Sequence, residues 1–291
     1  MRVLPLCCLL VAPLAAQQSP AAAARELVLE RAQAASEASY ATGIATALPV
    51  YLSIDAAVLW PGAGVLRGST QVGRFFAAQT SLEGARITWQ AMHLEISDDA
   101  TLALMWGAAV VDRPTLGKVP ATHRIARFLA AWQPVSGEWR IAALAFAGLL
   151  NGAETVWNDS LGERELPMLP STGVGGAFIA ADSAFAAEAA RAGAQRAFTH
   201  WAAADAVTFS GTGELSIGRD AIGRGFEGDA NQWSWGAVAA GASADGSLGW
   251  TAGQAVIAGK QRTSKSKYLT LWRREKDGSV HFLSDGGNGR P

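Results

Sequence analysis

The residues best suited to proton transfer lie near the C-terminal end of the chain. Asp285 follows an apolar-rich run from Val280 and precedes two glycines. A carboxyl group placed among aromatic side chains loses hydration, so its pKa rises and it can act as an acid or a base. Tyr268, on the preceding expected strand, offers an O–H donor to a developing oxyanion. The structural alternative is that Asp285 caps a turn and Tyr268 is a core residue.

Two histidines add candidate partners. His281 precedes Asp285 by an even step, which on a regular strand places both side chains on one face and allows a His–Asp dyad. His123 and Arg127 are also an even step apart on one expected strand. They form a candidate acid–base or anion-binding pair, or else they flank a solvent-exposed strand face.

No metal or cofactor is expected. His93 and Glu95 place two ligand types on one strand face, but the chain has only 4 His and no third ligand is evident. The sequence contains no phosphate-binding glycine loop, no Walker sequence and no nucleophile elbow.

Aromatic residues are the other candidate ligand contacts. The chain has 11 Trp, and ligand pockets favour aromatic linings, although most tryptophans are expected in the core. The candidate ligand-binding residues are Trp60, Trp106, Trp201, Phe209 and Trp250, with His123 and Arg127 as polar contacts.

Bulk properties limit the classes of partner. A length of 291 residues suits two domains of ordinary size. The formal net charge of -1 gives no field for attracting nucleic acid or anionic membranes, so neither is an expected partner.

The N-terminal residues 1–17 are typical of a signal peptide. Arg2 provides a short positive region, and the apolar run Val3–Leu14 is too short to span a bilayer. Both cysteines, Cys7 and Cys8, lie inside this leader, so the mature chain would hold no disulfide. We therefore expect a periplasmic or secreted protein without stable membrane insertion.

The chain repeats itself. Helical spacing over 25–52 and a short helix near 69–76 precede four expected strands at 87–96, 102–111, 123–132 and 139–146. The second half matches the first at a constant offset of 150 residues in its helices, and the matched pairs include Gly43/Gly193, Asp55/Asp205 and Phe76/Phe226. The offset shrinks to 146 and then 140 further on, which places deletions in loops.

These motifs resemble a known family. The second half carries Asp205-Ala206-Val207, the run 268–274, Asp277-Gly278-Ser279 and the ending 284–288, with Asp182 expected to cap its first helix. Nearly all of this half is similar to the SnoaL-like and DUF4440 branch of the NTF2-like superfamily. The first half resembles it more weakly and has Leu144 where the second half has Asp285.

The resemblance implies an α+β fold. In each domain a curved antiparallel sheet wraps around N-terminal helices as a cone and leaves an apolar pocket at its wide end. Members often dimerise through the sheet, so fused copies would form a pseudo-dimer. The superfamily includes isomerases, dehydratases, cyclases and binding proteins, so the fold does not fix the function.

Together these features predict a signal peptide at 1–17, a degenerate first domain at 25–150, a linker at 151–177 with a helical piece near 157–165, and a second domain at 178–291. The expected function is binding of a small, largely apolar molecule. One alternative is an isomerase, dehydratase or cyclase that uses Asp285 as acid or base. Another is an interaction module in which the first copy covers the second sheet. Self-association through sheet faces is the expected protein contact.

Overall fold

The computed structural model describes residues 19–79, 82–118, 120–148, 166–173, 175–210 and 213–290. The expected signal peptide at 1–17 and the expected helical piece at 157–165 lie outside these ranges. Within the described ranges, no helix is both long and apolar enough to cross a membrane.

The first domain combines three helices with a six-stranded sheet. Its elements are α1 (Pro20–Thr42), α2 (Ile44–Tyr51), β1 (Leu52–Leu59), β2 (Leu66–Arg67), α3 (Gly68–Ala78), β3 (Arg86–Ile96), β4 (Ala103–Arg113), β5 (Thr122–Val135) and β6 (Glu138–Ala147). The strand order is β2-β1-β6-β5-β4-β3. Strands β3 to β6 form the expected antiparallel meander.

The second domain repeats this arrangement. Its elements are α4 (Gly176–Ala192), α5 (Ala194–Trp201), β7 (Ala202–Phe209), β8 (Leu215–Ile217), α6 (Arg219–Arg224), β9 (Gln232–Ala242), β10 (Leu248–Ala258), β11 (Thr263–Arg274) and β12 (Val280–Gly289). The strand order is β8-β7-β12-β11-β10-β9. The α+β prediction, with helices packed on a sheet in each of two domains, is confirmed.

The sheets are mixed, whereas wholly antiparallel sheets were expected. β1 runs parallel to β6, and β7 runs parallel to β12. Parallel neighbours need a long crossover between them, and the segment from α3 through the meander supplies it in the first domain. The helix and meander after β7 do the same in the second.

The two sheets match in register as well as in strand order. The last hairpin of the first domain shifts register between Ala131 and Trp132, and that of the second shifts between Leu271 and Trp272. Each shift inserts one extra residue into the last strand and turns its following side chains over. The repeat seen in the sequence is therefore also a repeat of backbone geometry.

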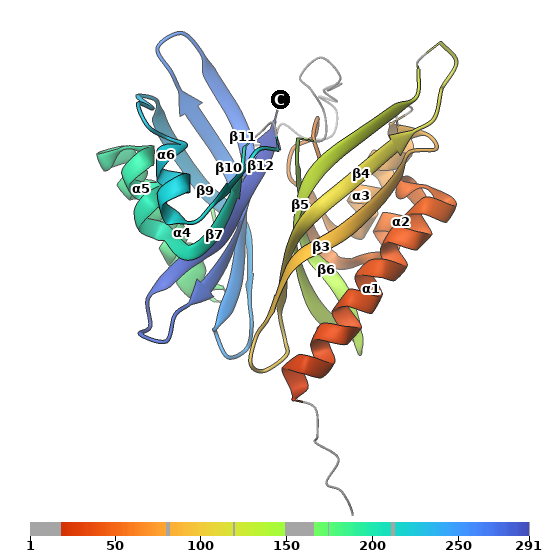
Figure 1. Cartoon of the computed structure of the whole chain (residues 1–291), viewed down its shortest axis with the longest axis horizontal. Helices are drawn as coiled ribbons and strands as arrows, with labels where there is room; N and C mark the ends of the chain where they lie inside the picture. Colours follow the sequence, from red (N-terminus) through yellow and green to blue (C-terminus); the bar gives the residue numbers. More distant parts are fainter. Residues whose placement is uncertain are drawn as a thin grey trace, which may run out of the picture.

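The two sheets pack against each other within the chain, and the helices cover their outer faces (Figure 1). The Trp106 ring of β4 meets the Phe209 ring of β7 edge-on at 5.8 Å. Asn288 Nδ2 donates to the carbonyl oxygens of Leu59 at 2.9 Å and Phe146 at 2.8 Å. These contacts join β12 to the end of β1 and to β6.

Two equivalent turns meet at the far end of this interface. The Asp99 backbone N–H donates to Asp245 Oδ2 at 3.2 Å, and the Asp245 N–H donates to Asp99 Oδ2 at 2.7 Å. Such a reciprocal contact between equivalent residues is what a two-fold axis produces in a homodimer. The chain is thus an intrachain pseudo-dimer.

Candidate functional site

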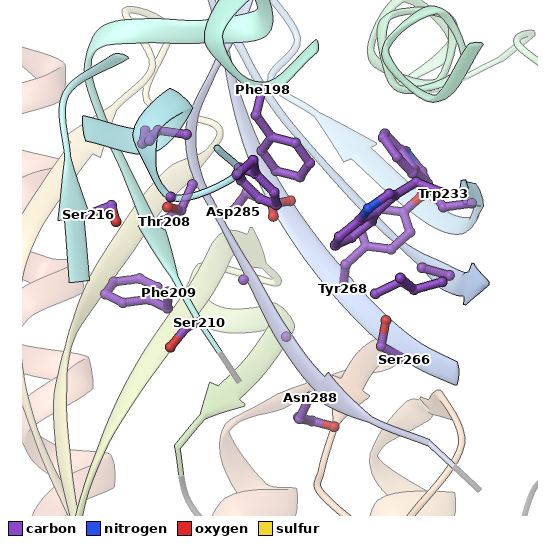
Figure 2. A pocket seen from close by; sticks show the side chains of 18 of the residues that line it. Phe198, Thr208, Phe209, Ser210, Ser216, Trp233, Ser266, Tyr268, Asp285 and Asn288 are labelled. Carbon is purple, nitrogen blue, oxygen red and sulfur yellow. The ribbon is translucent and has the colours of Figure 1, made fainter. Parts of the chain in front are cut away.

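The second domain contains a partly open cavity of about 460 Å³ between its helices and the concave face of its sheet (Figure 2). Several aromatic residues line it: Phe185 from α4, Phe198 from α5, Phe226 after α6, and Trp233 and Trp235 from β9. Phe198 and Phe226 stack at 4.1 Å between ring centroids, and Phe185 meets Trp235 edge-on at 4.7 Å. The rings hold one another in place around the cavity.

Asp285 and Tyr268, the two leading candidates from the sequence, line this same cavity. Thr270 Oγ1 donates to Asp285 Oδ2 at 2.6 Å, and this is the one hydrogen bond that the Asp285 side chain makes to the described part of the chain. Burial raises the pKa of Asp285 to about 6, although the Thr270 hydrogen bond acts in the opposite direction. The carboxyl group therefore retains an acceptor oxygen for a ligand.

Asp182 lies directly behind Tyr268. Tyr268 Oη donates to Asp182 Oδ2 at 2.7 Å, and Thr251 Oγ1 donates to Asp182 Oδ1 at 3.3 Å. Trp272 Nε1 in turn donates to Thr251 Oγ1 at 2.8 Å. Burial raises the pKa of Asp182 to about 7, the hydrogen bond from Tyr268 opposes this, and the nearby charge of Asp285 adds to it. Burial and the Asp182 charge raise the pKa of Tyr268 well above its ordinary value.

The expectation that Asp182 caps the first helix of the second domain is wrong. Helix α4 begins at Gly176, so Asp182 lies inside the helix and is only 1% exposed. The sequence does contain a signal for this position. Phe178, Asp182 and Phe185 share one helical face, and an acid on an apolar face points to a buried, partnered carboxyl group.

The network sets what Tyr268 can do. While Asp182 is ionised, it accepts the Tyr268 O–H, which then cannot donate into the cavity. Once Asp182 is protonated, its own O–H can donate to Tyr268 Oη and leave the tyrosine proton for a ligand oxygen. Besides Asp182, Asp285 can also exchange a proton near neutral pH, and its side chain lines the cavity. The site thus combines one acid–base group with one switchable donor.

The expected dyad between His281 and Asp285 does not form. Phe282 stacks on Phe185 of α4 at 5.6 Å, so Phe282 points to the helix-covered face of β12, and Asp285, three residues later, lies on the same face and lines the cavity. The extra residue at the β12 bulge makes this odd step possible. His281, next to Phe282, consequently points to the opposite face of β12.

Of the aromatic candidates, Phe209 alone lines the cavity among the described residues. Trp106 contacts Phe209 from the first domain and stacks on His93. Trp201 Nε1 donates to Glu188 Oε2 at 2.9 Å on the outer helices. Trp106 and Trp201 therefore support the structure around the cavity without lining it.

Trp250 and Trp60 also lie elsewhere. Trp250 is on the face of β10 turned away from α4, where its indole fills the space that a side chain at Gly241 would need. Trp60 is 2% exposed in the interior of the first domain and meets Phe76 at 4.9 Å and Phe146 at 5.3 Å. Both are packing residues.

His123 and Arg127 stay apart from the cavity. His123 Nδ1 lies 2.6 Å from Asp112 Oδ1 across β4 and β5, and both side chains are exposed. Arg127 lies further along β5, half-buried. The first domain therefore contributes neither of these two residues to the site.

The polar network is confined to the second domain. The equivalent positions of the first domain hold apolar residues: Ala32, Met105, Phe128, Ala130 and Leu144 stand for Asp182, Thr251, Tyr268, Thr270 and Asp285. All five of these apolar residues are buried. Because the strand register is the same in both domains, the fold itself does not require the polar set.

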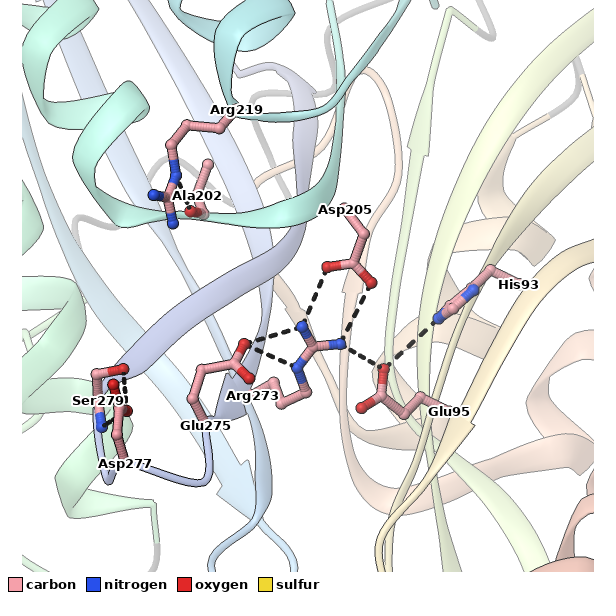
Figure 3. Close-up of polar contacts among 9 residues, drawn as sticks. All are labelled: His93, Glu95, Ala202, Asp205, Arg219, Arg273, Glu275, Asp277 and Ser279. Carbon is pink, nitrogen blue, oxygen red and sulfur yellow. Dashed lines mark hydrogen bonds and ion pairs between the residues drawn. The ribbon is translucent and has the colours of Figure 1, made fainter.

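The His93–Glu95 pair joins the two domains instead of forming a metal site. His93 Nε2 is 3.6 Å from Glu95 Oε2, the oxygen that also pairs with Arg273 Nη1 at 3.4 Å (Figure 3). Arg273 Nη2 contacts Asp205 Oδ1 at 3.0 Å and Glu275 Oε1 at 2.8 Å. These carboxylates raise the pKa of Arg273 above its ordinary value. The described residues include no cluster of three or more His, Cys, Asp or Glu placed to hold a metal ion.

No protein-family model matches the chain, and no curated protein matches it. Several solved structures are similar. An NTF2-like protein with a cystatin-like fold from Novosphingobium aromaticivorans is 17% identical and covers 48% of this chain and 86% of its own, with a TM-score of 0.35. An NTF-2 like protein of unknown function from Shewanella oneidensis is 10% identical, covers 42% and 97%, and has a TM-score of 0.35.

A ketosteroid isomerase-like protein from Erwinia carotovora is 13% identical and covers 45% of this chain and 95% of its own, with a TM-score of 0.33. Each of these neighbours spans less than half of the present chain. Their identity and TM-scores are low, and by themselves they assign no function.

Proposed function

We propose that the second domain binds a small, largely apolar molecule in its aromatic cavity and that Asp285 contacts the polar group of that molecule. The observation that carries the proposal is a partly open cavity of about 460 Å³ that is lined by several aromatic residues and by the half-buried carboxyl group of Asp285, one oxygen of which has no side-chain partner among the described residues. A few placed polar groups in an apolar cavity are the usual composition of a small-molecule site. The SnoaL-like and DUF4440 resemblance of this half supports the same assignment.

The contrast between the domains also supports binding in the second one. The first domain retains the fold with Leu144 in place of Asp285 and Phe128 in place of Tyr268. A buried polar network costs stability unless every member is satisfied, and an apolar core avoids that cost. The network of the second domain is therefore retained for a role other than folding.

Calorimetric titration with naphthylmethanol, an uncharged bicyclic alcohol, tests the proposal. Ala255 lines the cavity and is 5% exposed, so Ala255→Phe fills the cavity and should weaken binding by about tenfold or more. The matched control is Ser234→Phe, which adds the same ring at an exposed position between Trp233 and Trp235 and should bind like the native chain. Equal affinity of the two variants, or no binding by the native chain, would overturn the proposal.

A second candidate function is proton transfer by Asp285 in an isomerase, dehydratase or cyclase reaction. It is favoured by a pKa near 6, which lets this carboxyl group both take up and release a proton near neutral pH. With any substrate found by screening, Asp285→Asn should lower kcat by about a hundredfold while leaving binding of naphthylmethanol nearly intact. Full turnover by that variant would exclude this role for Asp285.

We also propose that the protein is exported to the periplasm or secreted after removal of residues 1–17. The support is the positive residue Arg2 followed by a short apolar run. N-terminal sequencing of the protein made in its own cells tests this proposal. A mature chain that begins within a few residues of Gln17 is the expected result, and an intact Met1 would contradict it.

A further inference from the structure

The side chains that line the cavity carry negative charge and no accessible positive charge among the described residues. Asp285 lies at the cavity wall, and Glu214, an exposed residue, lies at its rim. Lys267 is also in the wall, but its side chain is fully buried and its Nζ donates to the Gly289 carbonyl oxygen at 2.8 Å. A ligand in the cavity therefore meets carboxyl groups and no free ammonium or guanidinium group.

The rest of the wall also favours a cation. The faces of aromatic rings carry the negative part of their quadrupole, so they attract a nearby cation, and the effect is larger where water is excluded. Five aromatic residues line the same cavity as Asp285: Phe185, Phe198, Phe226, Trp233 and Trp235. A carboxylate and several aromatic rings lining one cavity are groups that attract an ammonium group.

The hydrogen bonding of Asp285 leads to the same ligand. Thr270 satisfies Oδ2, and Oδ1 has no protein partner among the described residues. The Asp285 side chain is half-buried, so it has less access to water than a surface carboxylate, and a further donor would stabilise its charge. Two nearby hydroxyl groups, those of Tyr268 and Thr251, donate to Asp182 and not to Asp285. An N–H donor from the ligand would supply what the protein does not.

We propose that the cavity is selective for a lipophilic primary amine, bound as its cation with the ammonium group on Asp285 and the hydrocarbon part among the aromatic rings. This inference rests on the proposed binding function and specifies the chemical class of the ligand. Carboxylic acids of the same shape are disfavoured, because their charge would face Asp285 and Glu214.

Three probes of matched shape test the inference by calorimetry at pH 7.5: naphthylmethylamine, naphthylmethanol and naphthoic acid. The native chain should bind the amine at least about tenfold more tightly than the alcohol, and the acid most weakly. Asp285→Asn should reduce the amine affinity to within about threefold of the alcohol affinity. Asp220→Asn, which removes an exposed carboxylate outside the cavity, should leave the order and the ratios unchanged.

The outcomes separate this inference from the function on which it rests. If the alcohol or the acid binds the native chain as tightly as the amine, the amine preference is wrong and the binding function stands. If none of the three probes binds, both fail. An amine preference that survives Asp285→Asn unchanged would overturn the assignment of Asp285 as the counter-ion. The affinities of the three probes are ranked on the native chain, so this part of the test does not depend on whether a variant folds.

Discussion

Asp182 is buried and Asp285 is half-buried, and their surroundings give them different tasks. Asp182 is enclosed by donors from Tyr268 and Thr251, whereas Asp285 has one donor and faces the cavity. Sites of proton transfer often contain two carboxyl groups whose different surroundings give them different pKa values and different roles. Asp182 therefore acts on a ligand only through Tyr268, and Asp285 can contact it directly.

Asp182 should make folding stability depend on pH. Its pKa is about 7 in the folded chain against 3.8 as the ordinary value, so the folded state binds the proton more tightly. The favourable contribution is fully present below about pH 4 and is lost as pH rises through 7, a change of roughly 4 kcal/mol. Asp182→Asn removes this titration and still accepts from Tyr268.

Urea unfolding at low and at mildly alkaline pH checks this expectation. At pH 8 the variant Asp182→Asn should be more stable than the native chain by about 1–4 kcal/mol, and near pH 4 the advantage should vanish. Asp220→Asn serves as an exposed control with no such difference. Identical pH dependence of the native chain and Asp182→Asn would show that Asp182 does not titrate in this way.

Asp285 should make amine binding depend on pH. The groups that face it are Asp182 from α4 and Tyr268 and Thr270 from β11. Because its pKa is about 6, the carboxylate that holds the ammonium is lost as pH falls through 6. Naphthylmethylamine should bind about tenfold more weakly at pH 5 than at pH 7.5, while naphthylmethanol changes little. Calorimetry at the two pH values measures both affinities. An equal change in affinity for both probes would contradict the role of the Asp285 carboxylate in binding the ammonium group.

At the scale of elements, the sequence predicted the bounds of the meander strands well, but it did not predict which face of β12 each side chain occupies. The four meander strands of the first domain were expected close to their observed bounds, because apolar alternation is a strong signal for half-buried strands. The bulge near Leu283 was not predicted, since an inserted apolar residue among apolar residues leaves no pattern. That one residue separated His281 from Asp285.

Part of the candidate site could be predicted from the sequence. Residue type and position predict Asp285 and Tyr268 as candidates, and both line one cavity. The predicted cap at Asp182 is wrong because α4 already begins at Gly176, six residues earlier in the chain. Most of the aromatic candidates were not at the cavity, since tryptophans in this chain also fill the domain interface and the first-domain core.

Substitutions at two equivalent glycines, Gly253 in the second domain and Gly107 in the first, test how β10 positions Tyr268. A Cβ at Gly253 would lie 2.4 Å from Tyr268 Oη and 2.3 Å from the Gly236 carbonyl oxygen. Gly253→Ala should therefore move Tyr268 away from Asp182, lower the free energy of unfolding by about 1–3 kcal/mol and weaken binding of naphthylmethanol. The equivalent change Gly107→Ala strains the first domain, where a Cβ would meet Gln90 and Phe128.

Thermal unfolding and calorimetry of both variants separate structure from function. Both should lose stability, but only Gly253→Ala should lose ligand affinity. Equal loss of affinity in Gly107→Ala would mean that general destabilisation, and not the position of Tyr268, controls binding.

At the scale of the whole molecule, the faces that would pair two chains are buried inside one chain. Leu129 on β5 is fully buried, and its Cδ1 lies 3.2 Å from where a side chain at Gly286 of β12 would begin. The expected self-association through sheet faces therefore has its counterpart within the chain. We expect a monomer in sedimentation velocity, and a stable dimer would contradict this.

Opening the interface should have a large effect. Leu129→Asp places a charge between the two sheets without a partner, which should cost about 3 kcal/mol or more and expose apolar sheet faces. Sedimentation of this variant should show self-association or unfolding, whereas an exposed control such as Ile125→Asp should stay monomeric. Native-like stability of Leu129→Asp would show that the two sheets do not depend on their mutual packing.

The most direct test of the central claim is a crystal structure of the chain with bromonaphthylmethylamine, in which anomalous scattering locates the bromine. We predict one strong bromine peak in the second-domain cavity among Phe185, Phe198 and Trp235, with the amine nitrogen within hydrogen-bonding distance of Asp285 Oδ1. The first domain, with Leu144 at the equivalent position, should show none. Bromine peaks confined to the surface or the domain interface, with the cavity unoccupied, would contradict a ligand site in the second domain.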